Sequence, residues 1–198
     1  MTSNPFYRLA MPLRAMRLIV AVTGASGVIY AKRLLEELRK RDVEIHLIIS
    51  DAGRLVAEEE LGGVEALEAL ADRVYDPNDL RAPPTSGSFK VDGMVIIPAS
   101  MKTVAAIANG YADNLITRAA DVQIKEGRRL IIVPRETPLS PIHLRNLLRL
   151  SLMGVRVLPA SPAFYHKPRS IEELVDFIVG KILEQLGFSH NLYRPWSP

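Results

Sequence analysis

Short apolar runs alternate with segments of helical periodicity along almost the whole chain. Residues 17–22 (RLIVAV) predict a buried strand, and Val28, Ala31 and Leu35 then recur at the spacing of an amphipathic helix. Strands that alternate with helices in this way form right-handed β-α-β units, whose parallel sheet is covered by helices on both faces. The sequence therefore predicts a single doubly wound α/β sheet, mostly parallel, of the Rossmann or flavodoxin-like kind.

The same pattern divides the chain into segments. Strands are predicted over residues 17–22, 43–49, 94–97, 130–133 and 155–158. Helices are predicted to begin at residue 28 and to cover 51–70, 101–108, 115–126, 141–153 and 171–186, with a loop over 76–89. We expect a flexible N-terminal extension over residues 1–15 and a flavin-binding α/β domain over 16–186. The tail, residues 187–198, is expected to close the site or to contact a neighbouring subunit.

Composition excludes several classes of function. The chain has no cysteine, so it forms no disulfide, thiolate metal site or thiol nucleophile. A net charge of +3 without a block of basic residues argues against nucleic acid as a partner. The apolar runs are too short to cross a membrane, and residues 1–15 contain Arg8 and Arg14 but no apolar signal segment. We expect a cytoplasmic enzyme, with Met11 and Met16 as alternative start residues.

Polar residues gather where the predicted strands end. Three strands run into Pro98, Pro134 and Pro159, and each strand is expected to stop there because proline cannot continue a hydrogen-bonded ladder. The polar residues that follow the strands are Ser26, Ser50, Ser100, Lys102, Thr103, Arg135, Glu136, Ser161, Tyr165 and His166. The carboxyl ends of parallel strands share one edge, where α/β proteins bind ligands. The alternative, that these residues only form turns, remains open.

Two loops at this edge suit anions. Residues 23–27 (TGASG) join a strand to a helix, where glycines allow close approach and first-turn N–H groups favour a phosphate. Ser26 can cap the helix or bind the anion, and a simple capped turn remains the alternative. The full G-x-G-x-x-G of a dinucleotide site is missing. Residues 98–103 (PASMKT) add two hydroxyls and an ammonium at a helix start, and Arg135-Glu136 is either a surface ion pair or a ligand-binding acid–base pair.

These segments together resemble one family. The chain resembles the UbiX family of flavin prenyltransferases over residues 16–196, through TGASG (23–27), IIS (48–50), APPTSGS (82–88), PASMKT (98–103), NLITRAADVQIKE (114–126), VPRETPLS (133–140) and PAFYHKP (162–168). The resemblance implies that dimethylallyl phosphate alkylates reduced FMN at N5, followed by ring closure onto C6, without a metal. It also implies a homododecamer and a UbiD-type decarboxylase that receives the prenylated FMN. Whether the donor is the monophosphate or the diphosphate stays open.

The resemblance also implies roles for individual residues. Flavin would be bound by Gly24, Ala25, Ser26, Ser50, Ser100, Met101, Lys102, Thr103 and Arg135. The donor phosphate would be bound by Tyr165, Lys181, Lys125, Arg118 and Glu60. Glu136, Ser26, Lys125 and Trp196 would take part in catalysis. The family often has arginine at position 181, so this contact loses its bidentate geometry here. Fixed cations suit a departing phosphate, and an aromatic face suits an allylic cation.

Other functions remain open at this stage. A flavin-dependent cysteine decarboxylase shares the fold, but such enzymes carry a histidine on the first helix, where this chain has Ile29-Tyr30. A non-catalytic FMN carrier or accessory subunit of a decarboxylase is a second alternative. A nicotinamide-dependent reductase is a weaker one. No spacing of the four histidines predicts a metal site, and only His166 lies in a loop of the expected site.

Overall fold

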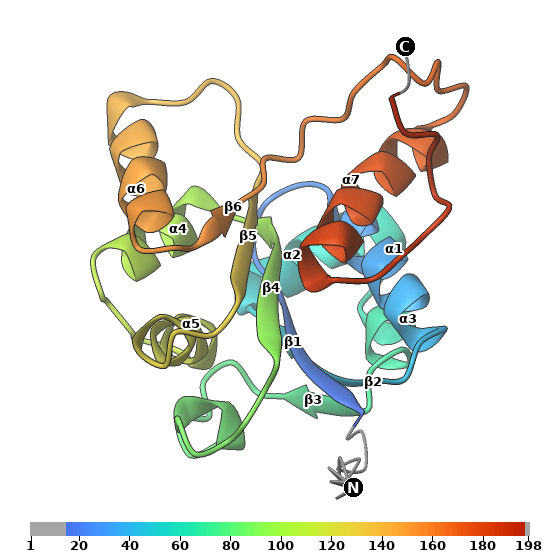
Figure 1. Cartoon of the computed structure of the whole chain (residues 1–198). Coiled ribbons are helices and arrows are strands. Elements are labelled where there is room, and N and C mark those ends of the chain that lie inside the picture. The colour runs from blue at the N-terminus through green and yellow to red at the C-terminus, as the bar shows by residue number, and fades with distance from the viewer. Residues whose placement is uncertain (1–14, 197–198) are drawn as a thin grey trace, which may run out of the picture.

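The sheet contains six strands, all parallel to their neighbours, in the order β3-β2-β1-β4-β5-β6 (Figure 1). The computed structural model describes residues 15–196, so the predicted extension, with Arg8, Met11 and Arg14, lies outside the described residues except for residue 15. The strands are β1 Met16–Val22, β2 Val43–Ile49, β3 Arg73–Tyr75, β4 Gly93–Ala99, β5 Leu130–Pro134 and β6 Arg156–Val157. The predicted doubly wound α/β fold is confirmed.

Helices cover both faces of this sheet (Figure 1). They are α1 Val28–Arg39, α2 Asp51–Leu61, α3 Glu65–Glu68, α4 Met101–Ala108, α5 Leu115–Lys125, α6 Pro141–Leu152 and α7 Ile171–Leu186, with a short 3-10 helix η1 at Pro83–Thr85. Alternate strand residues face opposite ways, so Leu18 and Val20 join the core under α1 and α7, whereas Ile19 and Ala21 join the core under α4 and α5. No helix in residues 15–196 has the length and hydropathy of a membrane span.

The structure differs from the sequence prediction at three places. The helix predicted over residues 51–70 is two helices, because Gly62 at φ 74° ends α2 in the left-handed region that favours glycine. Strand β3 was not predicted, since three residues at a sheet edge give too little periodicity. Strand β4 continues through Pro98 to Ala99, and its register with β5 shifts there; a missing N–H is tolerated at such an irregularity.

A cluster of charges joins α1 to its surroundings. The Glu37 side chain is only 6% exposed, and its carboxylate lies 2.9 Å from Arg33, 2.6 Å from Lys40 and 2.9 Å from Arg41. Arg33 also binds Asp176 of α7 at 2.6 Å. Burial alone would raise the pKa of Glu37, but hydrogen bonds from Lys40 and Arg41 and the charge of Arg33 outweigh it and lower the pKa to about 2. This cluster therefore helps to hold α7 against α1.

We expect Glu37→Gln to lower the free energy of unfolding by about 1–3 kcal/mol at pH 7, because three cations lose a shared partner. A carboxyl whose pKa falls on folding stabilises the protein above its ordinary pKa, here 4.5, and loses that effect as the pH falls toward about 2. Denaturant unfolding of wild type and variant should therefore converge as the pH drops from 5 to 2.

The matched control is Glu36→Gln, because Glu36 is 36% exposed and lies 3.5 Å from the same Arg33. We expect this control to change the free energy of unfolding by less than about 0.5 kcal/mol at pH 7. A Glu37→Gln effect that is the same at pH 3 and at pH 7 would show that the charge of Glu37 does not stabilise the fold.

Candidate functional site

A cavity of about 300 Å³ lies at the carboxyl edge of the sheet, and we call it the edge pocket. It is lined by residues that follow β1, β2, β3 and β4 and by residues at the start of α5, namely Gly24, Ser50, Asp51, Ala52, Pro77, Asn78, Ser100, Lys102, Thr103, Asp113, Asn114 and Ile116. Five residues predicted to bind flavin meet here: Gly24, Ser50, Ser100, Lys102 and Thr103. The edge pocket therefore assembles more than half of the predicted flavin-binding set.

Three helices begin at the edge pocket. Ser50, Ser100 and Asn114 are the N-caps of α2, α4 and α5, and each side chain accepts a hydrogen bond from the backbone N–H three residues on, at 3.0, 3.4 and 3.0 Å. The N-terminus of each helix carries a partial positive charge that favours anions. Lys102 is exposed and forms no ion pair with any residue from 15 to 196. The pocket thus favours a phosphate group.

Two carboxylates line another part of the same pocket. Asp113 accepts hydrogen bonds from Asn114 Nδ2 at 2.9 Å and Thr117 Oγ1 at 3.3 Å, and Asp51 follows the N-cap Ser50. Carboxylates repel a phosphate but accept hydrogen bonds from hydroxyl groups. The edge pocket therefore matches a phosphorylated polyol. Sequence analysis missed Asp113 and Asn114, although an asparagine directly before an apolar helix is a recognisable N-cap signal.

The buried hydroxyl of Thr23 joins two of the loops that form the pocket. Thr23 Oγ1 donates to the Pro98 carbonyl at 2.8 Å and accepts from the Ser100 N–H at 2.8 Å, and the side chain is 1% exposed. Gly24 then passes so close to α2 that an added Cβ would lie 2.5 Å from the Cβ of Ala52. Thr23 and Gly24 therefore fix where Ser100 stands relative to α2.

The start of α1 does not present free N–H groups, contrary to the expectation for the loop of residues 23–27. The N–H groups of Gly27 and Val28 donate to the Glu60 carboxylate of α2, at 2.9 and 2.8 Å. Gly27 is the N-cap, with φ 103° and no side-chain cap, so Ser26 does not cap this helix. In this structure the anion at the start of α1 is Glu60 of the same chain. Ser26 itself is exposed.

The loop after β5 lies beside Ser26. Arg135 Nε donates to the Ser26 carbonyl at 3.2 Å, so these two predicted residues are brought together. Glu136 is exposed and accepts a hydrogen bond from the Thr137 N–H at 3.0 Å, and it forms no ion pair with Arg135. Of the two interpretations of the Arg135-Glu136 pair, the simple surface ion pair is not formed. Both side chains stand at the carboxyl edge, as predicted.

A second cavity at this edge, about 260 Å³, lies between the loop before α7 and the C-terminal tail, and we call it the tail pocket. It is lined by Tyr165, His166, Lys167, Arg194, Pro195 and Trp196. The rings of Tyr165 and Trp196 meet edge to face, with centroids 5.4 Å apart. Tyr165 also contacts Phe177 of α7 at 6.0 Å, and the Lys181 ammonium lies 5.8 Å from the centre of the Phe177 ring. Tyr165 and Trp196 are therefore in contact, and Phe177 is a shared neighbour of Tyr165 and Lys181.

The remaining predicted cations lie elsewhere in the chain. Arg118 Nε donates to the Thr85 carbonyl at 3.1 Å, and its guanidinium pairs with Asp121 at 2.7 Å. Lys125 ends α5, about 16 Å from the edge pocket by the rise of the helix. Helix α5 covers one face of the sheet and α7 covers the other (Figure 1). Lys125 therefore lies on a helix of one face of the sheet, whereas Tyr165 contacts Phe177 on a helix of the other face.

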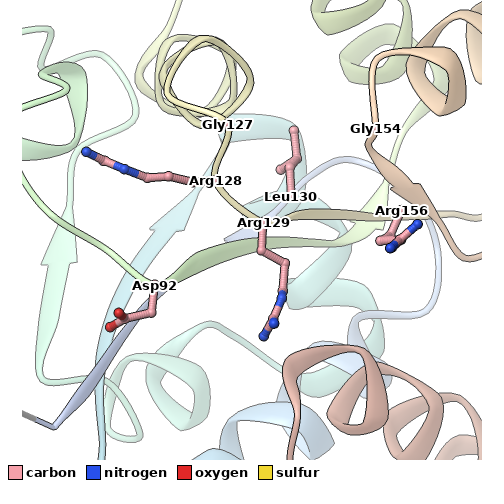
Figure 2. Close-up of a pocket in the computed structure, with 7 residues that line it drawn as sticks. All are labelled: Asp92, Gly127, Arg128, Arg129, Leu130, Gly154 and Arg156. Atoms are coloured by element: carbon pink, nitrogen blue, oxygen red, sulfur yellow. The ribbon is translucent and has the colours of Figure 1, made fainter. Parts of the chain in front are cut away.

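A larger cavity, about 460 Å³, lies at the opposite edge, beside the starts of β4, β5 and β6 (Figure 2). Figure 2 shows the Arg128 side chain extended away from Arg129 and Arg156. Arg128 donates to the Phe89 carbonyl at 3.0 Å, and Arg129 donates to the carbonyl of Leu186 at 2.6 Å. Two of the three arginines thus hold a loop and the end of α7. Volume alone does not make this cavity the functional site.

We expect Thr23→Val to destabilise the fold by about 1–3 kcal/mol, because it leaves the Ser100 N–H without a partner and removes one of the two hydrogen bonds that the Pro98 carbonyl accepts. Hydrogen–deuterium exchange of the Ser100 amide should become about 10- to 100-fold faster. Thr23→Ser keeps the hydroxyl and should leave this exchange rate close to wild type. Equal exchange rates in both variants would contradict a positioning role for the hydroxyl.

Comparisons with known proteins find relatives along most of the chain. The model of the flavoprotein family matches residues 8–183. The flavin prenyltransferase UbiX of Methanothermobacter thermautotrophicus is 53% identical over 182 residues, which are 91% of this chain and 95% of that protein. A dodecameric FMN-dependent UbiX-like decarboxylase of Escherichia coli superposes with a TM-score of 0.90 at 47% identity, covering 92% of this chain and all of that chain.

A third protein carries ligands. AnUbiX, crystallised in complex with FMN and dimethylallyl pyrophosphate, superposes with a TM-score of 0.91 at 45% identity, over 93% of this chain and 99% of that chain. The match extends over nearly the whole length in every case, so the relationship covers the domain and not one motif. The chain belongs to the flavoprotein family and, within it, to the UbiX flavin prenyltransferases.

Proposed function

We propose that this chain transfers a dimethylallyl group from its phosphate ester to reduced FMN, and that a UbiD-type decarboxylase receives the prenylated FMN. The observation that carries the proposal is the edge pocket, where three helix N-termini and Lys102 face one cavity. AnUbiX, with FMN and an allylic pyrophosphate bound, gives support from a close relative. Family membership favours prenyl transfer over cysteine decarboxylation.

The residues of the edge pocket fit FMN. The N-caps Ser50 and Ser100, with Thr103 and Lys102, would hold the phosphate through N–H groups, hydroxyls and one positive charge. Asp113 would accept hydrogen bonds from the ribityl hydroxyls. Ser26 and Arg135 contact each other at the same edge of the sheet, and the aromatic flavin ring would lie against them. Gly24 allows the ligand to approach the backbone closely.

The chemistry needs few groups from the protein. Bound reduced FMN supplies the nucleophile, N5 and then C6, that accepts the allylic carbon. Tyr165, Lys181 and cations on α5 would stabilise the negative charge that grows on the departing phosphate. The rings of Tyr165 and Trp196 would shelter a developing allylic cation from water. Glu136 would exchange protons at the edge of the site. Fixed cations fill the role of a metal, so the reaction should proceed in EDTA.

We propose further that the site is completed by a second copy of the chain. Lys125 ends α5 and Tyr165 contacts Phe177 of α7, on opposite faces of the sheet, so a second chain would bring the two residues to one phosphate. Helix α6 supports an oligomer, because Ile142, Leu148 and Leu152 are 66%, 60% and 79% exposed and leave a large apolar face without cover in the chain. The dodecameric UbiX-like protein of Escherichia coli supports the same conclusion.

The first test measures flavin binding and turnover. We expect FMN to bind at least about 100-fold more tightly than riboflavin, because riboflavin lacks the phosphate. Lys102→Met should weaken FMN binding about 10-fold without affecting riboflavin binding. Arg81→Met, at a side chain that is 99% exposed, should change the affinity for neither flavin.

Anaerobic incubation with reduced FMN, dimethylallyl phosphate and EDTA should give a flavin with one added isoprenyl unit by mass spectrometry. FMN binding with no prenylated flavin from either the phosphate or the diphosphate would favour the carrier.

The second test mixes two inactive variants. We expect Lys125→Ala and Tyr165→Phe each to reduce prenylation at least about 10-fold, because each removes a group from the phosphate. If the two residues come from different subunits, co-expression of both variants rebuilds about a quarter of the sites by random assembly. Mixed assemblies should then recover about a quarter of wild-type activity. Recovery of none, from assemblies shown to be mixed by mass spectrometry, would place both residues in one chain.

A further inference from the structure

The tail pocket carries positive charge that no residue from 15 to 196 neutralises through an ion pair. Two of its lining residues, Lys167 and Arg194, are cations, and none is acidic. Neither Lys167 nor Arg194 forms an ion pair with any residue from 15 to 196. An enclosed surface with two cations and no carboxylate raises the local concentration of anions.

Lys181 differs from these two cations because it forms an ion pair within the chain. The family resemblance assigns it to the donor phosphate. Its ammonium lies 3.0 Å from the Glu184 carboxylate on the next turn of α7 and 5.2 Å from the centre of the Tyr193 ring. Hydrogen bonding with Tyr193 and then with Glu184 raises the pKa of Lys181, so it stays charged but its charge is already shared. The unshared cations beside Tyr165 are Lys167 and Arg194.

The backbone holds both cations in place. Lys167 has φ 55°, and its N–H donates to the Phe164 carbonyl at 3.0 Å, so the loop is a closed turn. Arg194 directly follows Tyr193, whose hydroxyl donates to Glu184 and whose ring packs where a Cβ at Gly180 would lie, 2.6 Å from it. The turn and the packing of Tyr193 on α7 thus set the backbone positions of Lys167 and Arg194.

One more polar group of this pocket lacks a partner. Both ring nitrogens of His166 are shielded from solvent and form no hydrogen bond with the described residues, while the ring stacks on Phe177 at 5.5 Å. Buried polar atoms are normally paired, so an imidazole without a partner is expected where a ligand atom completes the set. An anionic oxygen would satisfy the N–H of this ring.

We propose that Lys167 and Arg194 form a second anion subsite, next to Tyr165, which binds the terminal phosphate of an allylic diphosphate. The inference rests on the proposed prenyl transfer and names its donor as the diphosphate. A second phosphate adds negative charge and acceptor oxygens, which match the two unshared cations and His166. In the transfer the allylic C–O bond breaks, diphosphate departs with the bonding electrons, and the flavin nitrogen that bonds the carbon releases its proton to water.

The test compares two donors on the full-length protein with reduced FMN under anaerobic conditions. We expect wild type to show a kcat/KM about 10-fold higher for dimethylallyl diphosphate than for dimethylallyl phosphate. Lys167→Met and Arg194→Met keep the aliphatic stem and remove the charge; each should lower kcat/KM for the diphosphate about 10-fold and for the monophosphate less than about 3-fold. Lys167→Arg should retain the preference, and Arg81→Met is the control for lost surface charge.

A second readout does not depend on turnover. Calorimetry with inorganic pyrophosphate and inorganic phosphate should show tighter binding of pyrophosphate by about 10-fold, and the double variant should lose this difference. Equal losses with both donors, or a wild-type preference for the monophosphate, would overturn the subsite. If wild type prenylates FMN with neither donor, the proposed function fails instead, and the pyrophosphate titration alone then decides whether the subsite exists.

Discussion

The site depends on the direction in which the strands run. Because all six strands are parallel, the helices after β2 and β4 must begin at the same edge, and α5 starts there as well. Three N-caps, Ser50, Ser100 and Asn114, thereby meet at one cavity without any dedicated binding loop. Their partial charges add at a single point, which no helix could achieve by itself. The Thr23 hydroxyl then holds the end of β1 against the end of β4 through two hydrogen bonds.

Much of this arrangement could be predicted from the sequence. Strands such as β1 and β2 are continuous apolar runs, and the helices carry a 3.6-residue period, so fold class and the polar edge followed directly. Ser50 and Ser100 could be placed at this edge because each directly follows a strand, and Thr103 because it lies in the first turn of the helix after β4. Local pattern could not show that Glu60, far along α2, would cap α1, since the pairing needs the final packing of two helices.

The opposite lesson comes from the charged residues. The family resemblance implies that Tyr165, Lys181 and Lys125 bind one phosphate, but it does not show that Lys125 lies on the other face of the sheet or that Lys181 pairs with Glu184. A charge has no periodicity, so its neighbours are set by tertiary structure and by other subunits. Lys167 lies in a loop and Arg194 in the tail, so no local pattern predicts that both line one cavity. Only the packing of the loop against the tail brings the two cations to the same pocket.

The carboxylate that caps α1 has a consequence for the size of nucleotide that the chain accepts. In dinucleotide-binding folds the N-terminus of the first helix receives a pyrophosphate. Here Glu60 neutralises that position, so a ligand with two linked phosphates along the β1 loop would meet a negative charge instead of free N–H groups. In this chain an internal carboxylate therefore occupies the position where a dinucleotide's pyrophosphate would bind. It should discriminate against FAD and nicotinamide dinucleotides before any side chain contacts the flavin ring.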